Sequence, residues 1–120
     1  MAQLGIKETD LYAPVKQLLE GQGYVVKGEV GAADVVAVSE TEELLIVELK
    51  SGFSLSLFHQ AVERKRVTDC VYIAVPRGTG PRFSKAVKNN KKLCRLLGLG
   101  LIIVRIADGH VEVIADPAPY

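Results

Sequence analysis

The chain lacks the features that mark several large classes of protein. Its 120 residues include no tryptophan and two cysteines, and no stretch approaches the roughly 20 apolar residues that a membrane helix requires. The N-terminus has no apolar segment of the kind found in secretory signal peptides. Zinc-ligand spacings, a P-loop, a GxGxxG fingerprint and internal repeats are also missing. We therefore expect a cytoplasmic protein without membrane attachment, in which Cys70 and Cys94 are buried, reduced thiols.

Hydrophobic residues make up 48% of the chain and charged residues 24%, which is typical of a globular domain. A length of 120 residues suffices for one domain with a hydrophobic core, so we expect residues 1–120 to form a single domain. The net charge of +1 conceals an uneven distribution. Residues 1–69 carry 7 Lys and Arg against 11 Asp and Glu, whereas residues 70–107 carry 8 basic residues and no acid. This basic block favours a local surface for a polyanion, although a solvated helix face would give the same pattern.

Residues 34–50 predict a β-hairpin with an unusual charge pattern. An apolar run follows Asp34, a polar turn covers residues 39–43, and a second apolar run ends at Glu48. If the five turn residues form the loop, Asp34 lies directly opposite Glu48, and strand alternation puts Lys50 on the same face. A slip of one residue would move the two carboxylates to opposite faces, so this is a prediction about register.

Two carboxylates placed opposite each other in a hairpin repel. Opposed Cβ atoms lie about 5 Å apart, which corresponds to roughly 3 kcal/mol at an effective dielectric constant near 20. A shared proton, a nearby lysine or a divalent cation would each offset this repulsion. Of these three, the cation is the one with consequences for chemistry.

The remaining sequence predicts a mixed α/β domain, because capping residues, glycines and hydrophobic periodicity mark further helices and strands. The predicted elements are a helix from Thr9 or Asp10 to about Glu20, a strand over 24–26, the hairpin, a helix from Ser54 or Ser56 to about Arg66, a strand over 70–75, a loop over 76–81, a helix over 83–97 and a closing hairpin of strands 101–106 and 111–114 around Asp108-Gly109. This order predicts one mixed sheet with helices on both faces.

The order αβββαβ, with Asp34 about fourteen residues before Glu48-Leu49-Lys50, resembles the PD-(D/E)XK nuclease superfamily. The resemblance covers nearly the whole chain and implies a restriction-endonuclease-like core with an extra C-terminal β-hairpin. One departure is that Ala33, and not proline, precedes Asp34. Four stretches look like an uncharacterised bacterial family of predicted phosphodiesterases within that superfamily: Glu8-Thr9-Asp10-Leu11-Tyr12, Gly28-Glu29-Val30-Gly31, Glu48-Leu49-Lys50-Ser51-Gly52-Phe53-Ser54-Leu55 and Thr68-Asp69.

The resemblance implies a Mg²⁺-dependent hydrolase, with Mn²⁺ as a substitute cation. Asp34 and Glu48 would be its acidic metal ligands, and the backbone carbonyl of Leu49 would complete the protein's share of the shell. Lys50 would orient or deprotonate the attacking water and balance charge on the phosphate.

Several other residues are candidates for supporting roles. Gln60 is a candidate catalytic residue, because it lies in the helix after the motif, where related nucleases and resolvases often place a glutamine near the metal site. It would equally suit an exposed helix position. Glu8 and Asp10 are both near the position of a supporting metal ligand on the first helix, with Glu8 as the candidate ligand, and Asp10 would equally be only an N-cap. Further candidates with less support are Glu29, in the loop before Asp34, and His59, whereas we expect His110 to lie on the surface of the closing hairpin.

The basic block supplies the expected contacts to nucleic acid. Within the third helix, lysine and arginine follow helical spacing on what should be its exposed side, with core positions on the other side. The expected phosphate contacts are Arg77, Arg82, Lys85, Lys88, Lys92 and Arg95, and the expected core positions are Ala86, Val87, Leu93, Cys94 and Leu97.

Three functions remain open from the sequence. The first is a metal-dependent nuclease acting on DNA, which we expect to dimerise if it cuts both strands of a duplex. The second is a non-catalytic nucleic-acid-binding module that kept the nuclease fold, although neither acid nor lysine of the motif is lost. The third is a structural or assembly domain whose hairpin carboxylates are exposed at a sheet edge.

Overall fold

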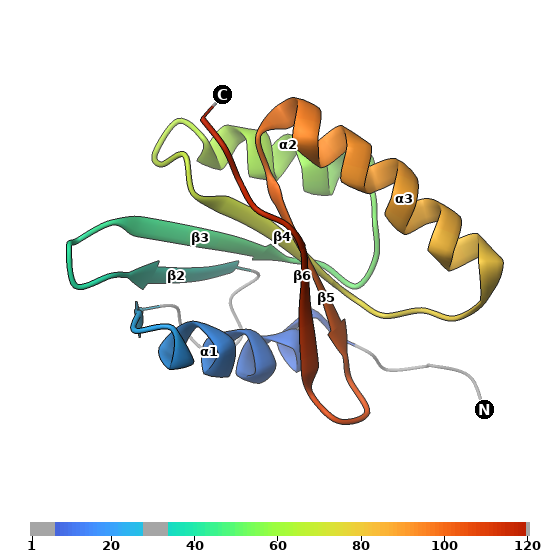
Figure 1. Ribbon diagram of the computed structural model, residues 1–120, viewed down its shortest axis with the longest axis horizontal. Coiled ribbons are helices and arrows are strands. Elements are labelled where there is room, and N and C mark those ends of the chain that lie inside the picture. Colours follow the sequence, from blue (N-terminus) through green and yellow to red (C-terminus); the bar gives the residue numbers. More distant parts are fainter. Residues whose placement is uncertain (1–6, 28–33, 120) are drawn as a thin grey trace.

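The computed structural model describes residues 7–27 and 34–119, and Figure 1 shows a central mixed sheet with helices on both of its faces. The elements follow one another in the order predicted from the sequence. They are η1 (Glu8–Leu11), α1 (Tyr12–Gly21), β1 (Val25–Val26), β2 (Asp34–Val38), β3 (Leu44–Leu49), α2 (Leu55–Arg64), β4 (Val71–Pro76), α3 (Gly80–Leu97), β5 (Gly100–Arg105) and β6 (His110–Ala115). The predicted α/β fold, with a restriction-endonuclease-like αβββαβ core and a C-terminal β-hairpin, is confirmed.

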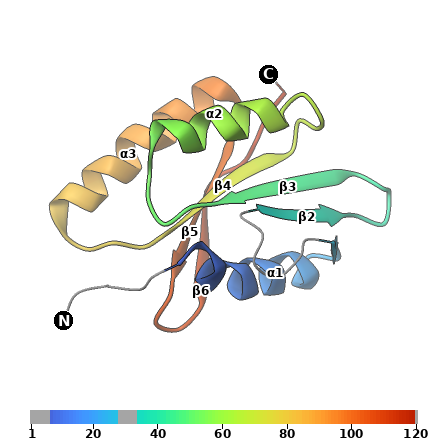
Figure 2. The same cartoon turned by 180° about the vertical axis from the view of Figure 1, so that it is seen from behind.

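The six strands lie side by side in chain order. Antiparallel pairing joins β1, β2 and β3, parallel pairing joins β3, β4 and β5, and β6 returns antiparallel to β5. Each parallel pair needs a crossover, and α2 and α3 supply the two crossovers. Both helices therefore cover one face of the sheet while α1 covers the other, as Figure 1 and the reverse view in Figure 2 show.

Hydrophobic residues on the two faces of the sheet form two cores. Under α1, Leu11, Val15 and Leu19 pack in one cluster with Val47 and Leu49 of β3. Under α2 and α3, the second cluster contains the helix residues Leu57, Phe58, Ala61 and Cys94 together with the strand residues Ile73, Leu101 and Ile103. Both faces of the sheet are covered, so its central parallel strands are buried on both sides. The sequences of β4 and β5 are nearly continuous runs of apolar residues for this reason.

The α2 helix starts at one of the two predicted caps, whereas α3 begins earlier than predicted. Ser54 is the N-cap of α2, and its hydroxyl accepts a hydrogen bond from the Leu57 backbone N–H at 3.1 Å. The α3 helix begins at Gly80, three residues before the predicted start and inside the predicted loop. The early start is explained by Pro81, because proline is favoured in a first helical turn.

One predicted core position of α3 is wrong. Leu93 is 37% exposed, because the face that packs on the sheet passes through Phe83, Val87, Cys94 and Leu97 and leaves Leu93 at its edge. The predictions for Val87, Cys94 and Leu97 are confirmed, and Ala86 is half-buried.

The two cysteines are free thiols in different surroundings. Cys94 is fully buried, and this burial raises the pKa of its thiol to about 12. Cys70 is half-buried, and loss of hydration again raises its thiol pKa. Neither thiol is activated as a nucleophile.

The helices of residues 7–27 and 34–119 include none with the length and apolar character of a membrane-spanning helix.

Candidate active site

The register of the β2–β3 hairpin is the one predicted. Val38 pairs with Leu44, Val36 with Ile46, and Asp34 with Glu48. Directly opposed residues share a face, so Asp34 and Glu48 occupy the same face of the sheet. On the other side of β3, Glu48 is the partner of Ile73, whose side chain belongs to the core under α2 and α3. The two acidic positions therefore belong to the α2 face.

Glu48 is the one charged residue that is buried in the part of the chain that the structure describes, with 2% of its surface exposed. Its Oε2 atom accepts a hydrogen bond from Nε of Arg64 at 2.7 Å. Arg64 is in the last turn of α2, and helical side chains lean toward the N-terminus of their helix, which helps it to reach back to the strand. Arg64 thus balances the negative charge of the Glu48 carboxylate. The sequence had suggested a proton, a lysine or a divalent cation in this role, and not an arginine.

Lys50 follows the end of β3 and takes part in a second ion pair. Its backbone N–H donates to the carbonyl of Ala74 at 3.1 Å, which fixes the chain just beyond the strand. Its Nζ atom lies 3.9 Å from Oε2 of Glu8 in η1, and both side chains are partly buried. Because β3 ends at Leu49, strand alternation alone no longer decides the direction of the Lys50 side chain. Lys50 pairs with Glu8, and Glu48 pairs with Arg64.

The structure gives Glu8 and Asp10 different roles. Glu8 faces Lys50, whereas the Asp10 carboxylate accepts the backbone N–H of Lys7 at 2.8 Å in a capping box. The predicted N-cap at Thr9 or Asp10 is therefore wrong, because the helical segment begins earlier, with Lys7 as its cap.

The other supporting candidates have more modest surroundings. Gln60 and His59 are exposed on α2, and it is Arg64, one turn after Gln60, that contacts Glu48. His110 is exposed at the start of β6, as expected for a surface hairpin. Glu29 lies outside the residues that the structure describes.

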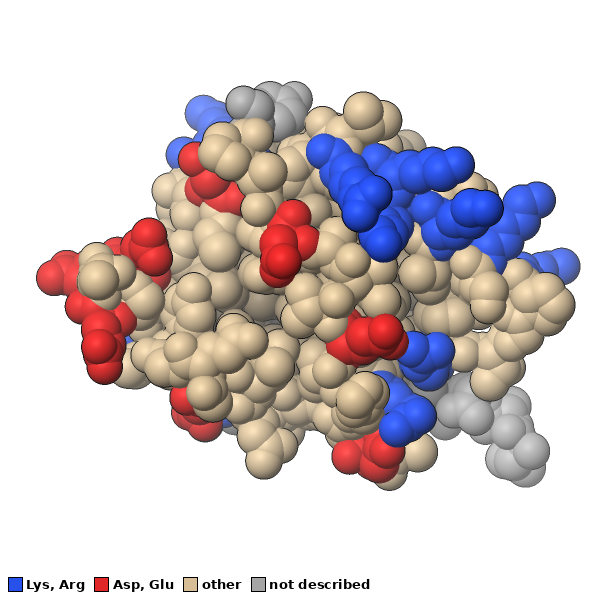
Figure 3. Space-filling view, in the orientation of Figure 1, with Lys and Arg blue, Asp and Glu red and all other residues tan. Residues whose placement is uncertain are grey.

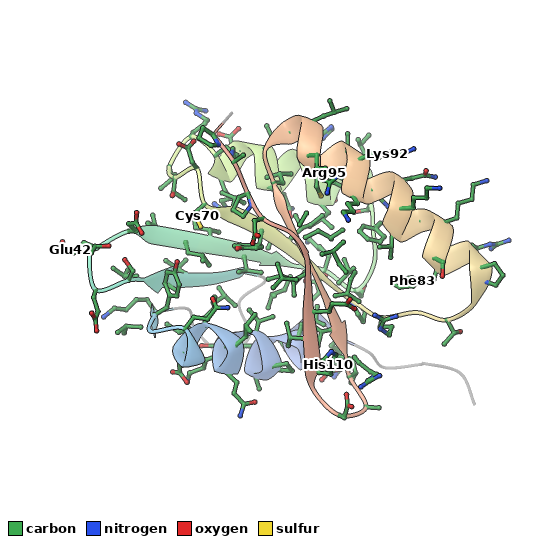
Figure 4. All side chains as sticks on the ribbon, in the orientation of Figure 1. Glu42, Cys70, Phe83, Lys92, Arg95 and His110 are labelled. Atoms are coloured by element: carbon green, nitrogen blue, oxygen red, sulfur yellow. The ribbon has the colours of Figure 1, made fainter. Side chains whose placement is uncertain are left out.

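On the face shown in Figure 3, the largest acidic group and the largest basic group lie at opposite ends, with further acidic residues between them. Acidic residues cluster near the β2–β3 turn, where Figure 4 labels Glu42, and basic residues gather over α3, where it labels Lys92 and Arg95. Five of the predicted phosphate contacts are exposed on this helix, which contains no acid: Arg82, Lys85, Lys88, Lys92 and Arg95. The sixth, Arg77, lies between β4 and α3, and its guanidinium bonds to Glu112 of β6 at 2.6 Å.

The residues of the β2–β3 site suit a hard divalent cation by their chemistry. Asp34 and Glu48 are cross-strand partners in the hairpin, and the carbonyl of Leu49, next to Glu48 in the chain, would be a third oxygen donor. Carboxylate and carbonyl oxygens are the ligands that Mg²⁺ and Mn²⁺ prefer. In residues 7–27 and 35–119, no group of three His, Cys, Asp or Glu side chains forms a metal-binding cluster.

Solved structures share this fold, among them the following two. An XisH family protein from Nostoc punctiforme matches with a TM-score of 0.55 and 20% identity, covering 91% of this chain and 99% of its own. An fdxN element excision controlling factor protein from Anabaena variabilis matches with a TM-score of 0.53 and 17% identity, covering 88% and 98%. No protein-family model matches the chain, and neither does any curated protein sequence. The chain is thus similar in fold to XisH family proteins over nearly its whole length.

Arg64 is the site residue that the sequence analysis missed. A signal was present, because Leu57, Ala61 and Arg64 follow helical spacing along the buried side of α2. A basic residue that continues an apolar stripe toward a strand with a buried acid is a candidate partner for that acid.

Proposed function

We propose that the protein is a metal-dependent phosphodiesterase that hydrolyses phosphodiester bonds in DNA. The observation that carries the proposal is the pairing of Asp34 with Glu48, which puts two acidic residues on one face of a hairpin. One of them, Glu48, is a buried carboxylate whose charge Arg64 balances, and a divalent cation would balance it in the same way. The motif lysine follows directly after the same strand.

In this proposal Asp34, Glu48 and the carbonyl of Leu49 would hold Mg²⁺ or Mn²⁺. When bound, the cation would act as a Lewis acid on a phosphoryl oxygen of the substrate. The side chain of Lys50 would orient or deprotonate the attacking water and balance charge on the phosphate. Glu8, at 3.9 Å from the Lys50 ammonium, would keep that ammonium in position.

The basic residues of α3 would bind the nucleic acid backbone. The α3 helix covers the same face of the sheet as α2, and Glu48 belongs to this face. Contacts of lysine and arginine with phosphates give affinity without sequence preference. The name of the Anabaena variabilis protein, an excision controlling factor, is compatible with a DNA substrate.

The test is a cleavage panel of single-stranded, duplex and branched DNA and of RNA, each with Mg²⁺, Mn²⁺ or a chelator. We expect DNA to be cut with either cation, no cleavage with the chelator, and no cleavage by Lys50→Ala. Lys16→Ala is the matched control, since Lys16 is on the helix of the other face and forms a loose 4.0 Å pair with Glu20. Cleavage by Lys50→Ala at the wild-type rate would overturn the assignment.

A second candidate is a nucleic-acid-binding module without catalytic activity. The Arg64–Glu48 pair favours it, because an arginine already neutralises the buried carboxylate that a metal would otherwise need to balance. This candidate predicts salt-dependent DNA binding that a chelator does not change, with no substrate in the panel cut.

A further inference from the structure

The Glu48–Arg64 ion pair differs from the other ion pairs between described residues. In the pairs Lys16–Glu20, Arg66–Glu63, Arg77–Glu112 and Arg105–Asp108, both side chains are at least 41% exposed. In the Lys50–Glu8 pair both side chains are partly exposed, at 21% and 34%. In the Glu48–Arg64 pair the carboxylate is 2% exposed while the arginine is 44% exposed. The acid is thus fixed inside the protein, and its partner is half in solvent.

This asymmetry decides which partner is able to leave. The Glu48 carboxylate is enclosed on a central strand, so moving it would displace packed neighbours. Arg64 is on the last turn of α2, and solvent would hydrate its guanidinium if it swung away. An unpaired buried charge is strongly destabilising. Arg64 therefore leaves Glu48 only when another cation binds the buried carboxylate and neutralises its charge.

We propose that Arg64 is a positioning residue that holds Glu48 in the metal-free protein and yields the carboxylate when a divalent cation binds. This inference rests on the proposed function, since it takes Glu48 as a metal ligand. Oε2 of Glu48 is occupied by Nε of Arg64 at 2.7 Å, so the cation competes with the guanidinium for this oxygen. The apparent affinity for the cation is then reduced by the fraction of molecules in which Arg64 occupies the acid.

The consequence is that removal of Arg64 should lower stability and strengthen cation binding at the same time. Arg64→Met keeps the apolar stem and removes the charge. Arg66→Met is the matched control, because it causes the same change in net charge two residues away. It breaks the ion pair with Glu63, whose side chains are 77% (Arg66) and 64% (Glu63) exposed, so little stability should be lost. Arg64→Lys keeps a charge that is able to compete for Glu48.

The experiment measures thermal unfolding of the wild type and the three variants in chelator and in saturating Mg²⁺ or Mn²⁺, together with calorimetric titration of each cation. In chelator, we expect Arg64→Met to unfold roughly 5–10 °C below the wild type and Arg66→Met within about 2 °C of it. The cation should raise the midpoint of Arg64→Met by more than it raises that of the wild type, with binding about tenfold tighter. Arg66→Met and Arg64→Lys should respond like the wild type.

The outcomes separate this inference from the proposed function. If the wild type binds the cation and Arg64→Met binds it equally or more weakly, Arg64 has a purely structural role and the inference is overturned. If Arg66→Met gains as much affinity as Arg64→Met, long-range charge explains the gain, which also overturns it. If neither the wild type nor any variant binds Mg²⁺ or Mn²⁺, the proposed function falls and this inference falls with it.

Discussion

Asp34 lies directly opposite Glu48 in the β2–β3 hairpin, on the face of the sheet that α2 and α3 cover. A shift of one residue in this pairing would send the two side chains to opposite faces. The five-residue turn over 39–43 fixes the register, and Ser39 closes it by donating its backbone N–H to the Glu43 carbonyl at 3.0 Å. The geometry of a turn at one end of the hairpin thus determines which residues meet at the other end.

If these two acids hold the cation, replacing either one by its amide should remove cleavage. We expect Asp34→Asn and Glu48→Gln to lower kcat by at least about a hundredfold in Mg²⁺, because an amide lacks the charge that a hard cation requires. Initial rates on the best substrate of the panel measure this effect. Glu43→Gln is the control, because Glu43 is exposed at the far end of β3, and cleavage by it should match the wild type. Equal losses in all three variants would point to net charge and not to a metal site.

Glu8 and Asp10 are neighbours in η1 but should respond differently to the same substitution. Glu8→Gln removes the charge that faces Lys50, so we expect cleavage to fall about tenfold while stability changes by less than about 0.5 kcal/mol, because this pair is partly exposed. Asp10→Asn weakens the capping box and should cost about 0.5–1 kcal/mol of stability without slowing cleavage. Urea unfolding and initial rates on both variants measure the two effects. A catalytic loss in Asp10→Asn alone would reverse the assignment.

The α3 surface should contribute to DNA binding through charge alone. For the triple variant Lys85→Gln, Lys88→Gln and Lys92→Gln, we expect weaker binding and a slope of log affinity against log salt that is lower by about 2–3, since each lost contact with duplex DNA removes about 0.9. Fluorescence anisotropy over a salt series, in the presence of chelator to prevent cleavage, measures the slope. Arg77→Gln should change the slope less, because Glu112 already pairs with that guanidinium. A slope that is unchanged in the triple variant would exclude α3 as the binding surface.

The sequence predicted the features that depend on alternation and local turn chemistry. The element order, the hairpin register, the Ser54 cap and the exposed basic side of α3 all follow from patterns within short segments. The partners of Glu48 and Lys50 could not be predicted in the same way. They come from α2 and η1, and which side chain reaches a strand from a separate helix depends on how that helix crosses the sheet. The exposure of Leu93 has the same origin, because it lies at the edge of the helix face that the sheet covers.

Lys65 joins three separate segments and should contribute strongly to stability. Its ammonium donates hydrogen bonds to the carbonyls of Asp69 at 3.1 Å, Gly98 at 2.8 Å and Ala118 at 2.5 Å, so it connects the end of α2 with the end of α3 and the C-terminal segment. Gly98 is the C-cap of α3, where a positive charge also interacts favourably with the helix dipole. We expect Lys65→Met to lower the free energy of unfolding by about 2 kcal/mol, measured by urea denaturation.

The matched control for Lys65 is Lys16→Met, which should change stability by less than about 0.5 kcal/mol, because its exposed i, i+4 pair is loose. A second measurement separates the proposed connection from a general effect of charge. Ala118 donates its backbone N–H to the Gly98 carbonyl at 3.1 Å, so loosening of the C-terminal segment in Lys65→Met should speed hydrogen exchange at this amide. Exchange at Ala118 that matches the wild type, together with an unchanged unfolding midpoint, would show that Lys65 does not hold these segments together.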